Sequence, residues 1–119
     1  MVVRHWRGVA HRHNAEAYLD HLRRAILPRL RELDGYRGSW VLRRDTSSGV
    51  EFVVLTSWDS LDSVRGFAGD DYETAVVPPD AREVLASFDD RVTHYDVVVD
   101  TTPAGSSGGL SSELGLEGL

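Results

Sequence analysis

Hydrophobic positions near the N-terminus change their period from two to between three and four. Residues 2–10 (VVRHWRGVA) alternate loosely and are rich in valine, which is typical of a β-strand. Further along, leucine and isoleucine recur every three or four positions, and this spacing predicts a helix with one apolar face. The positions on that face are Leu19, Leu22, Ile26, Leu30 and Leu33.

The same stretch indicates where this helix begins, breaks and ends. Asn14 suits the N-cap, and Glu16 in the first turn complements the helix dipole. Pro28 lies within the apolar stripe, and because proline has no backbone N–H, we expect a kink or a division near residues 24–28. Gly35 suits the left-handed position that follows the last turn of a helix.

Two β-rich runs then surround a short polar segment. Residues 37–44 (RGSWVLRR) and residues 50–58 (VEFVVLTSW) have strand-like composition, and residues 45–49 (DTSSG) separate them. Serine and glycine between two such runs predict a β-hairpin.

The remainder of the pattern predicts two short helices and a last strand. Residues 59–69 predict a helix that begins at Asp59 or Ser60. After a Pro-Pro pair, a second short helix is predicted from Asp80, and residues 91–99 (RVTHYDVVV) predict the last strand. The inward positions are Leu61, Val64 and Phe67 in the first helix, and Val84, Leu85 and Phe88 in the second.

This element order, β-α-β-β-α-β, is that of the split βαβ or ferredoxin-like motif. It predicts an α+β domain over residues 1–100, with a four-stranded antiparallel sheet and helices on one face. Large apolar residues occur at both parities in the strands, so the second face is also expected to be partly apolar. An uncovered apolar face needs a partner, and a homodimer with the sheet faces together, a dimeric α/β barrel, is the simplest closed solution.

Composition narrows the classes of function. The chain has 119 residues, of which 41% are hydrophobic, and its net charge of −6 argues against nucleic-acid binding through phosphates. The ten arginines within residues 4–44 are interpreted as the solvated sides of a helix and two strands. The absence of cysteine excludes disulfides and thiolate catalysis. No run approaches 18 apolar residues, so we expect no membrane span and a cytoplasmic protein.

Four residues are candidates for catalysis. His5 and His94 lie on the first and last predicted strands and could meet as an acid–base pair. Trp58 at a strand–helix junction could form a pocket wall, and Tyr72 could also serve catalysis. Each has a structural alternative: the histidines could bond at a sheet face or dimer seam, and the aromatic residues could belong to the core.

His11 and His13 stand two positions apart and could share one face as metal ligands. No carboxylate or third histidine lies near them in sequence except His21, one helix away. We therefore interpret them as surface histidines and expect no metal site.

Four stretches of the domain are similar to a known family: RHWRG (4–8), residues 18–44, residues 51–80 and THYDVV (93–98). They resemble the antibiotic biosynthesis monooxygenase domain family. The resemblance implies a dimeric α+β barrel. It also implies oxidation of a small aromatic or polyketide-type substrate by O₂ without a cofactor, in an apolar pocket with a few polarising hydrogen bonds.

The family motif can be followed residue by residue. Trp58 matches the family's tryptophan at the end of the third strand, whereas Val54 and Val64 stand where the family has an asparagine and a tyrosine. A non-catalytic, small-ligand-binding or accessory barrel is therefore an alternative function.

Two related families suggest other possible functions. Haem-degrading relatives place an axial histidine ten residues after the same tryptophan, and this position is Ala68 here, so haem is not expected. Polyketide-cyclase relatives use a histidine in the first strand, which His5 could match, whereas Phe67 and Glu73 stand at the family's tyrosine and second histidine. A cyclase-like enzyme is a further alternative.

After Asp100 the sequence changes character. Residues 101–113 are rich in glycine and serine and predict a flexible linker. Residues 114–119 (LGLEGL) resemble the loading peptide of encapsulin cargo proteins, which implies packaging inside an encapsulin nanocompartment. Leu114, Gly115, Leu116 and Leu119 match that pattern. The alternatives are a tail that packs on its own dimer and a disordered terminus.

Overall fold

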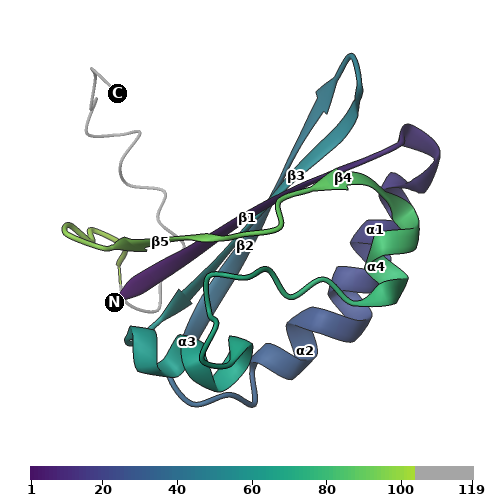
Figure 1. Cartoon of the computed structure of the whole chain (residues 1–119). Coiled ribbons are helices and arrows are strands. Elements are labelled where there is room, and N and C mark those ends of the chain that lie inside the picture. The colour runs from purple at the N-terminus through teal and green to yellow at the C-terminus, as the bar shows by residue number, and fades with distance from the viewer. Residues whose placement is uncertain (104–119) are drawn as a thin grey trace, which may run out of the picture.

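In the computed structural model, which describes residues 1–103, the helices lie on one side of a β-sheet (Figure 1). The predicted α+β class and ferredoxin-like architecture are confirmed. None of the helices in this part of the chain has the length and apolar character needed to cross a membrane. The strands are β1 Val2–Ala10, β2 Tyr36–Thr46, β3 Gly49–Trp58, β4 Leu85–Phe88 and β5 Thr93–Asp96. The helical segments are η1 Arg12–Asn14, α1 Ala15–His21, η2 Leu22–Ile26, α2 Leu27–Leu30, α3 Leu61–Ala68 and α4 Pro79–Val84.

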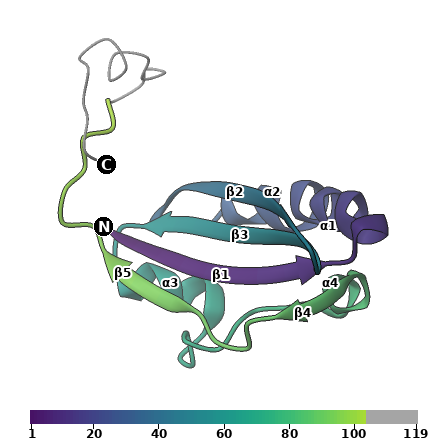
Figure 2. The same cartoon turned by 90° about the horizontal axis from the view of Figure 1, so that it is seen from above.

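The strands are ordered β2-β3-β1, and both β4 and β5 pair with the remaining edge of β1 (Figure 2). All of these pairs are antiparallel. Arg4 on the first half of β1 lies opposite His94 on β5, and Gly8 on the second half lies opposite Phe88 on β4. Two short strands thus share the place that one last strand has in the predicted motif.

The C-terminal elements differ from their predicted bounds. Residues predicted to continue the second short helix to Phe88 form strand β4 instead, and the last strand covers Thr93–Asp96 rather than residues 91–99. The edge of β1 explains the difference, because its backbone groups need partners and this segment supplies them. Immediately after β4, the Asp89 N–H donates to the carbonyl of Arg7 at 2.9 Å.

The first helical region is divided near the position that Pro28 predicts. After α1 the chain forms η2, a π-helical segment, and the Leu27 N–H donates to the carbonyl of Leu22, five residues earlier. Pro28 has no N–H to donate to residue 24, so the hydrogen bonds cannot continue at ordinary spacing. The local fold at η2 therefore follows from one residue of the sequence.

Three turn and capping predictions can be compared with the structure. Asn14 is the N-cap residue of α1, although its side chain accepts no hydrogen bond there. Ser60 caps α3, and its hydroxyl accepts from the Ser63 N–H at 3.3 Å. Gly35 has a φ of 82°, the left-handed conformation predicted for it, and a Cβ at this position would overlap the Ser63 side chain.

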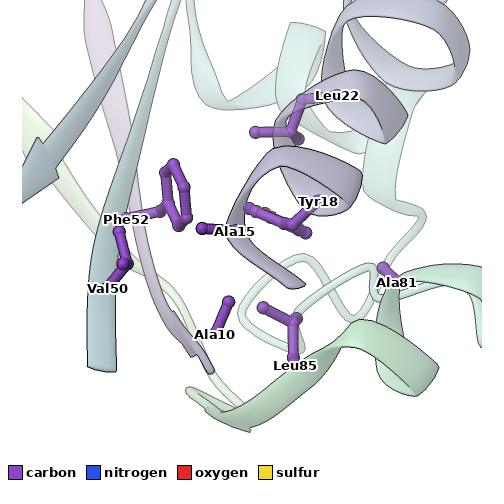
Figure 3. Close-up of a cluster of buried hydrophobic side chains, with 8 residues drawn as sticks. All are labelled: Ala10, Ala15, Tyr18, Leu22, Val50, Phe52, Ala81 and Leu85. Atoms are coloured by element: carbon purple, nitrogen blue, oxygen red, sulfur yellow. The ribbon is translucent and has the colours of Figure 1, made fainter. Parts of the chain in front are cut away.

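The core lies between the sheet and the helices. Val50 and Phe52 project from β3 and pack against Tyr18 of α1 and Leu22 of η2 (Figure 3). Burial of these apolar side chains is the main favourable contribution to folding. A second cluster of fully or almost fully buried side chains consists of Leu30, Trp58 and Val64.

The opposite face of the sheet has no cover within residues 1–103. We call Trp40, Leu42 and Tyr95 the outer apolar patch; they are 52%, 48% and 57% exposed. On the same face, Glu51 accepts hydrogen bonds from Arg7 at 2.8 Å and from Arg44 at 3.1 Å. The second apolar face predicted from the strand pattern is therefore present.

Candidate functional site

A cavity of about 360 Å³ lies between the helix-facing side of the sheet and the helices. Five polar or charged side chains line it from different parts of the fold: Arg4 from β1, Thr56 from β3, His21 from α1, Arg29 from α2 and Glu32 just after α2. A pocket with apolar walls and a few convergent polar groups is typical of a small-molecule site. The apolar wall includes Leu22, Ile26, Leu30, Val54, Phe67 and Val77.

The π-helical segment η2 shapes one wall of this cavity. His21 ends α1, Leu22 and Ile26 are the first and last residues of η2, and all three line the cavity. Single π turns inside helices occur frequently at functional sites. The division of the helix at Pro28 therefore has a consequence for the site as well as for the fold.

Arg4 is a buried cation in the wall of the cavity. It is only 4% exposed, and burial lowers the pKa of Arg4 to about 10, so the guanidinium is still charged at neutral pH. Within residues 1–103, no carboxylate lies within ion-pair distance of it. The interpretation of this arginine as a solvated surface residue was wrong, because β1 turns its even-numbered side chains towards the helices.

The Arg4 guanidinium is held by neutral acceptors. Its Nη1 donates to the carbonyl of Tyr72 and to Nε2 of His94, the latter at 3.1 Å, and its Nη2 donates to the carbonyl of Thr74 at 3.3 Å. The ring of Phe67 lies against it, with 5.6 Å from the guanidinium carbon to the ring centre. A guanidinium has five N–H groups, so two have no acceptor in the part of the chain described.

Trp58 belongs to the core and reaches the cavity only through its neighbours. Its side chain is fully buried, its Nε1 donates to Thr56 Oγ1 at 2.9 Å, and its ring stacks on Phe67 with centres 5.6 Å apart. Thr56 and Phe67 line the cavity. Because the Thr56 oxygen accepts from Trp58, the Thr56 hydroxyl hydrogen is still available for donation.

His21 is the second polar group that the sequence did not indicate. Its Nε2 is buried and has no hydrogen-bond partner within residues 1–103. Its ring stacks on that of Tyr18, with 6.5 Å between the ring centres. Buried polar atoms without partners are uncommon in folded proteins, and one that lines a cavity is a candidate for binding or catalysis.

The structure separates the two histidines predicted to form an acid–base pair. His94 faces Arg4 on the helix side of the sheet, whereas His5 lies on the outer face, where its ring meets that of Tyr95 edge-on at 6.5 Å. They do not meet. His5 is also the residue on which the cyclase-like alternative depends, and it faces away from the cavity.

Tyr72 and His94 lie together beside Arg4. The Tyr72 ring contacts the His94 ring, with 5.4 Å between the ring centres. The guanidinium carbon of Arg65 lies 5.3 Å from the centre of the Tyr72 ring. Burial, and after it the charge of Arg4, lowers the pKa of His94, so this imidazole is neutral at neutral pH. These two candidates thus surround a cavity-lining residue.

His11 and His13 lie on the surface at the start of the first helical region. Their rings stack with centres 5.5 Å apart, and both residues are exposed. Residues 1–103 contain no group of three or more histidine, aspartate or glutamate side chains placed to hold a metal ion.

None of the polar residues that line the cavity was predicted as a site residue, and two of them, Arg4 and His21, had only weak local signals. Arg4 is in a strand that contains a second arginine, Arg7, and a strand with one face in water is expected to carry such residues. In the sequence Arg4 therefore resembles a solvated arginine. His21 follows an aspartate on a helix that presents many charged residues. Arg4 is two positions from Trp6, which packs against the core, and this shared parity was the pattern that could have placed Arg4 on the inner face.

Comparison with known proteins identifies the fold. No family model and no curated protein matches the sequence. Among solved structures, a protein described as a putative antibiotic biosynthesis monooxygenase from Deinococcus radiodurans is similar with a TM-score of 0.57 at 19% identity, covering 88% of this chain and 100% of that one.

Two further solved structures have similar values. A protein from Bacillus cereus with the same description has a TM-score of 0.56 at 13% identity, covering 88% of this chain and 98% of that one. Rv0793 from Mycobacterium tuberculosis has a TM-score of 0.55 at 18% identity, covering 85% of this chain and 98% of that one. At these identities the comparison establishes a shared fold.

Proposed function

We propose that this protein binds a small aromatic or polyketide-type molecule in the cavity and oxidises it with O₂, as a cofactor-independent oxygenase. The observation that carries the proposal is the buried, unpartnered Nε2 of His21 in an otherwise mainly apolar cavity. The similarity in fold to proteins described as antibiotic biosynthesis monooxygenases also supports an oxygenase function.

The chemistry requires a substrate with an acidic C–H bond, such as the methylene of an anthrone. In this proposal Nε2 of His21 accepts one methylene proton, and the electron pair of the broken C–H bond stays on the substrate. The substrate anion gives electrons to O₂ and forms a C–O bond, and loss of water from the resulting peroxide leaves a carbonyl. One methylene and one O₂ become one carbonyl and one water, so no other reductant is needed.

Two positions where the family has polar residues are valines here, and only one of them contributes surface to this site. Val54 lines the cavity, and Val64 is fully buried in the core beside Trp58. Neither can donate or accept a proton, so in this proposal the proton passes to His21. The same two valines favour the alternative, a barrel that binds the ligand without converting it.

Oxygen consumption distinguishes these two functions. With anthrone as the substrate, we expect O₂ uptake by the wild type and a loss of roughly 10²- to 10⁴-fold in His21→Ala, the usual contribution of a general base. His11→Ala, which changes an exposed histidine, is the matched control and should keep full activity. Binding of anthrone without O₂ uptake would instead establish the non-catalytic alternative.

We also propose that the protein is a homodimer through the outer faces of its sheets. The outer apolar patch supports this arrangement, since a monomer would leave Trp40, Leu42 and Tyr95 in water. A two-fold interface places the same patch on both partners and closes the assembly.

The proposed targeting peptide, Leu114, Gly115, Leu116 and Leu119, and most of the linker of residues 101–113 lie outside the described residues. We propose that this segment binds an encapsulin shell protein, on the basis of its sequence pattern. Several tails on one oligomer would strengthen a weak peptide–shell contact through effective concentration. Co-expression with an encapsulin shell, with and without residues 114–119, tests this, and equal packaging of both forms would contradict it.

A further inference from the structure

We infer that the cavity selects ligands with a negatively charged oxygen, which binds to the free N–H groups of Arg4 and the hydroxyl of Thr56. The rest of the ligand, a flat apolar body, would lie on the wall formed by Ile26, Leu30 and Phe67. This inference rests on the proposed function, because it takes the cavity to be the ligand site.

The first step is the uncompensated charge of Arg4. Two other arginines that line the sheet have carboxylate partners, Arg7 with Glu51 at 2.8 Å and Arg43 with Glu16 at 2.9 Å. Arg4 is more deeply buried than either, yet its acceptors are two carbonyls and a neutral imidazole. Glu32 also lines the cavity but makes no ion pair with Arg4, so an anionic ligand would provide the compensation that this costly buried charge lacks.

The second step is the rigidity of the guanidinium. Its bonds to the carbonyls of Tyr72 and Thr74 and to His94 fix the plane of the group without neutralising it. A fixed guanidinium loses little conformational entropy when it binds a planar oxyanion, and its fork of N–H groups matches a carboxylate. Tyr72 and His94, predicted as catalytic candidates, act here as positioning residues.

The third step is a second donor on the neighbouring strand. Arg4 on β1 is paired with Thr56 on β3, and both line the cavity. The oxygen of Thr56 already accepts from Trp58, so the hydroxyl can offer its hydrogen to the same anionic oxygen. Trp58 thereby influences the ligand through Thr56 without touching it.

Two ligand types share this chemistry: an aromatic carboxylate and an ionised phenol or enol. The second type bears directly on the proposed oxidation, because electrons leave an ionised oxygen-substituted ring more readily than a neutral one. Both present an anionic oxygen to the same two residues, so the experiment has one arm for each.

The carboxylate arm compares 2-naphthoate with the neutral isostere 2-naphthamide by calorimetry at pH 7.5. We expect naphthoate to bind the wild type roughly 10- to 100-fold more tightly, the usual range for a charge-assisted hydrogen bond. Arg4→Gln should lose that preference, Arg4→Lys should keep part of it, and both should retain naphthamide binding. If Arg4→Gln fails to fold, Arg4→Lys and Arg29→Gln decide: Arg29 also lines the cavity, and loss of the preference only in Arg29→Gln would overturn the inference.

The phenol arm follows the absorption spectrum of bound 2-naphthol at the same pH, where the free phenol is neutral. Appearance of the naphtholate band on binding is the expected result. Equal affinities for naphthoate and naphthamide, with bound naphthol staying neutral, would overturn the inference while the proposed function stands. Failure of all three aromatic probes to bind would instead overturn the proposed function.

Discussion

The guanidinium of Arg4 and the imidazole of His94 share a hydrogen bond across strands β1 and β5, with 3.1 Å between Nη1 and Nε2. A guanidinium can only donate, so Nε2 of His94 is the acceptor and Nδ1 carries the proton. Protonation of His94 would remove this acceptor and place two positive charges together. The pair therefore links the shape of the cavity to pH.

This link predicts a pH-dependent contribution to stability. His94 has a lowered pKa in the folded protein because of burial and the charge of Arg4, with Glu73 opposing the shift. Near the ordinary histidine pKa of about 6.5, the unfolded chain therefore binds more protons than the folded one. The stabilisation is present above that pH and is lost as the pH falls through the folded-state pKa.

His94→Gln tests this prediction, because the glutamine amide oxygen can still accept from Arg4 but does not titrate. We expect thermal unfolding of the wild type to lose more Tm between pH 7.5 and pH 5.5 than that of the variant. The other groups facing this site, Tyr72 and Glu73, are unchanged in both proteins. Equal Tm losses in the two proteins would contradict a role for His94 in the pH response.

A second prediction concerns Trp58, which the structure places in the core. Trp58→Phe removes buried volume between Tyr36 and Phe67 and takes away the donor to Thr56. We expect a loss of about 1 to 3 kcal/mol in the free energy of unfolding, measured by urea denaturation.

Trp58→Phe should change stability more than it changes ligand affinity or the preference for naphthoate over naphthamide, because Trp58 does not line the cavity. A variant of unchanged stability but abolished activity would show that Trp58 has the direct catalytic role suggested by its place in the sequence motif. Trp40→Phe, on the outer face, is the control for a tryptophan change outside the core.

The third prediction separates backbone conformation from steric overlap at two glycines. Gly35 and Gly69 have φ angles of 82° and 83°, but only at Gly35 would a Cβ overlap another side chain, that of Ser63. Gly69 has a ψ of −172°, in a region that is almost restricted to glycine, so Gly69→Ala should cost about 1 to 3 kcal/mol from conformation alone. Gly35→Ala should cost clearly more, and equal costs in urea denaturation would show that Ser63 moves aside without penalty.

The fourth prediction tests the proposed homodimer. Leu42→Asp places a charge in the outer apolar patch, and an interface there would bury it without a partner. Light scattering should show a dimer for the wild type and a monomer for the variant, with an unchanged circular dichroism spectrum. Leu61→Asp, an exposed leucine on α3, is the control and should stay dimeric. A monomeric wild type would contradict the proposal.

Local sequence patterns were sufficient to predict an element where its hydrophobic period and its boundary residues indicated the same secondary structure. The first helical region had its stripe, its break at Pro28 and its turn at Gly35 in the sequence, and all three are present in the structure. Residues 85–88 were different, because the three-residue spacing of Leu85 and Phe88 is that of a helix, and only an irregularity in the register with β1 lets both pack on the core from a strand. Pairing with the edge of β1, a tertiary contact, decided for the strand.

The candidate site was harder to predict because its polar groups are defined by what surrounds them. Nothing in the segment around Arg4 shows that its carboxylate partners are missing, since those would come from distant parts of the chain. Trp58, in contrast, was found through a family motif and lies one contact away from the cavity. The motif located a residue next to the cavity but not the polar groups that line it.

The π turn at η2 has a consequence for aligning this sequence with its structural relatives. It accommodates one more residue per turn than the surrounding α-helix, and each helical residue advances the chain by about 100° around the axis. A relative with an uninterrupted helix therefore needs a one-residue gap between Leu22 and Ile26. Without that gap, an alignment that is correct before the π turn assigns the wrong residues to the cavity wall after it.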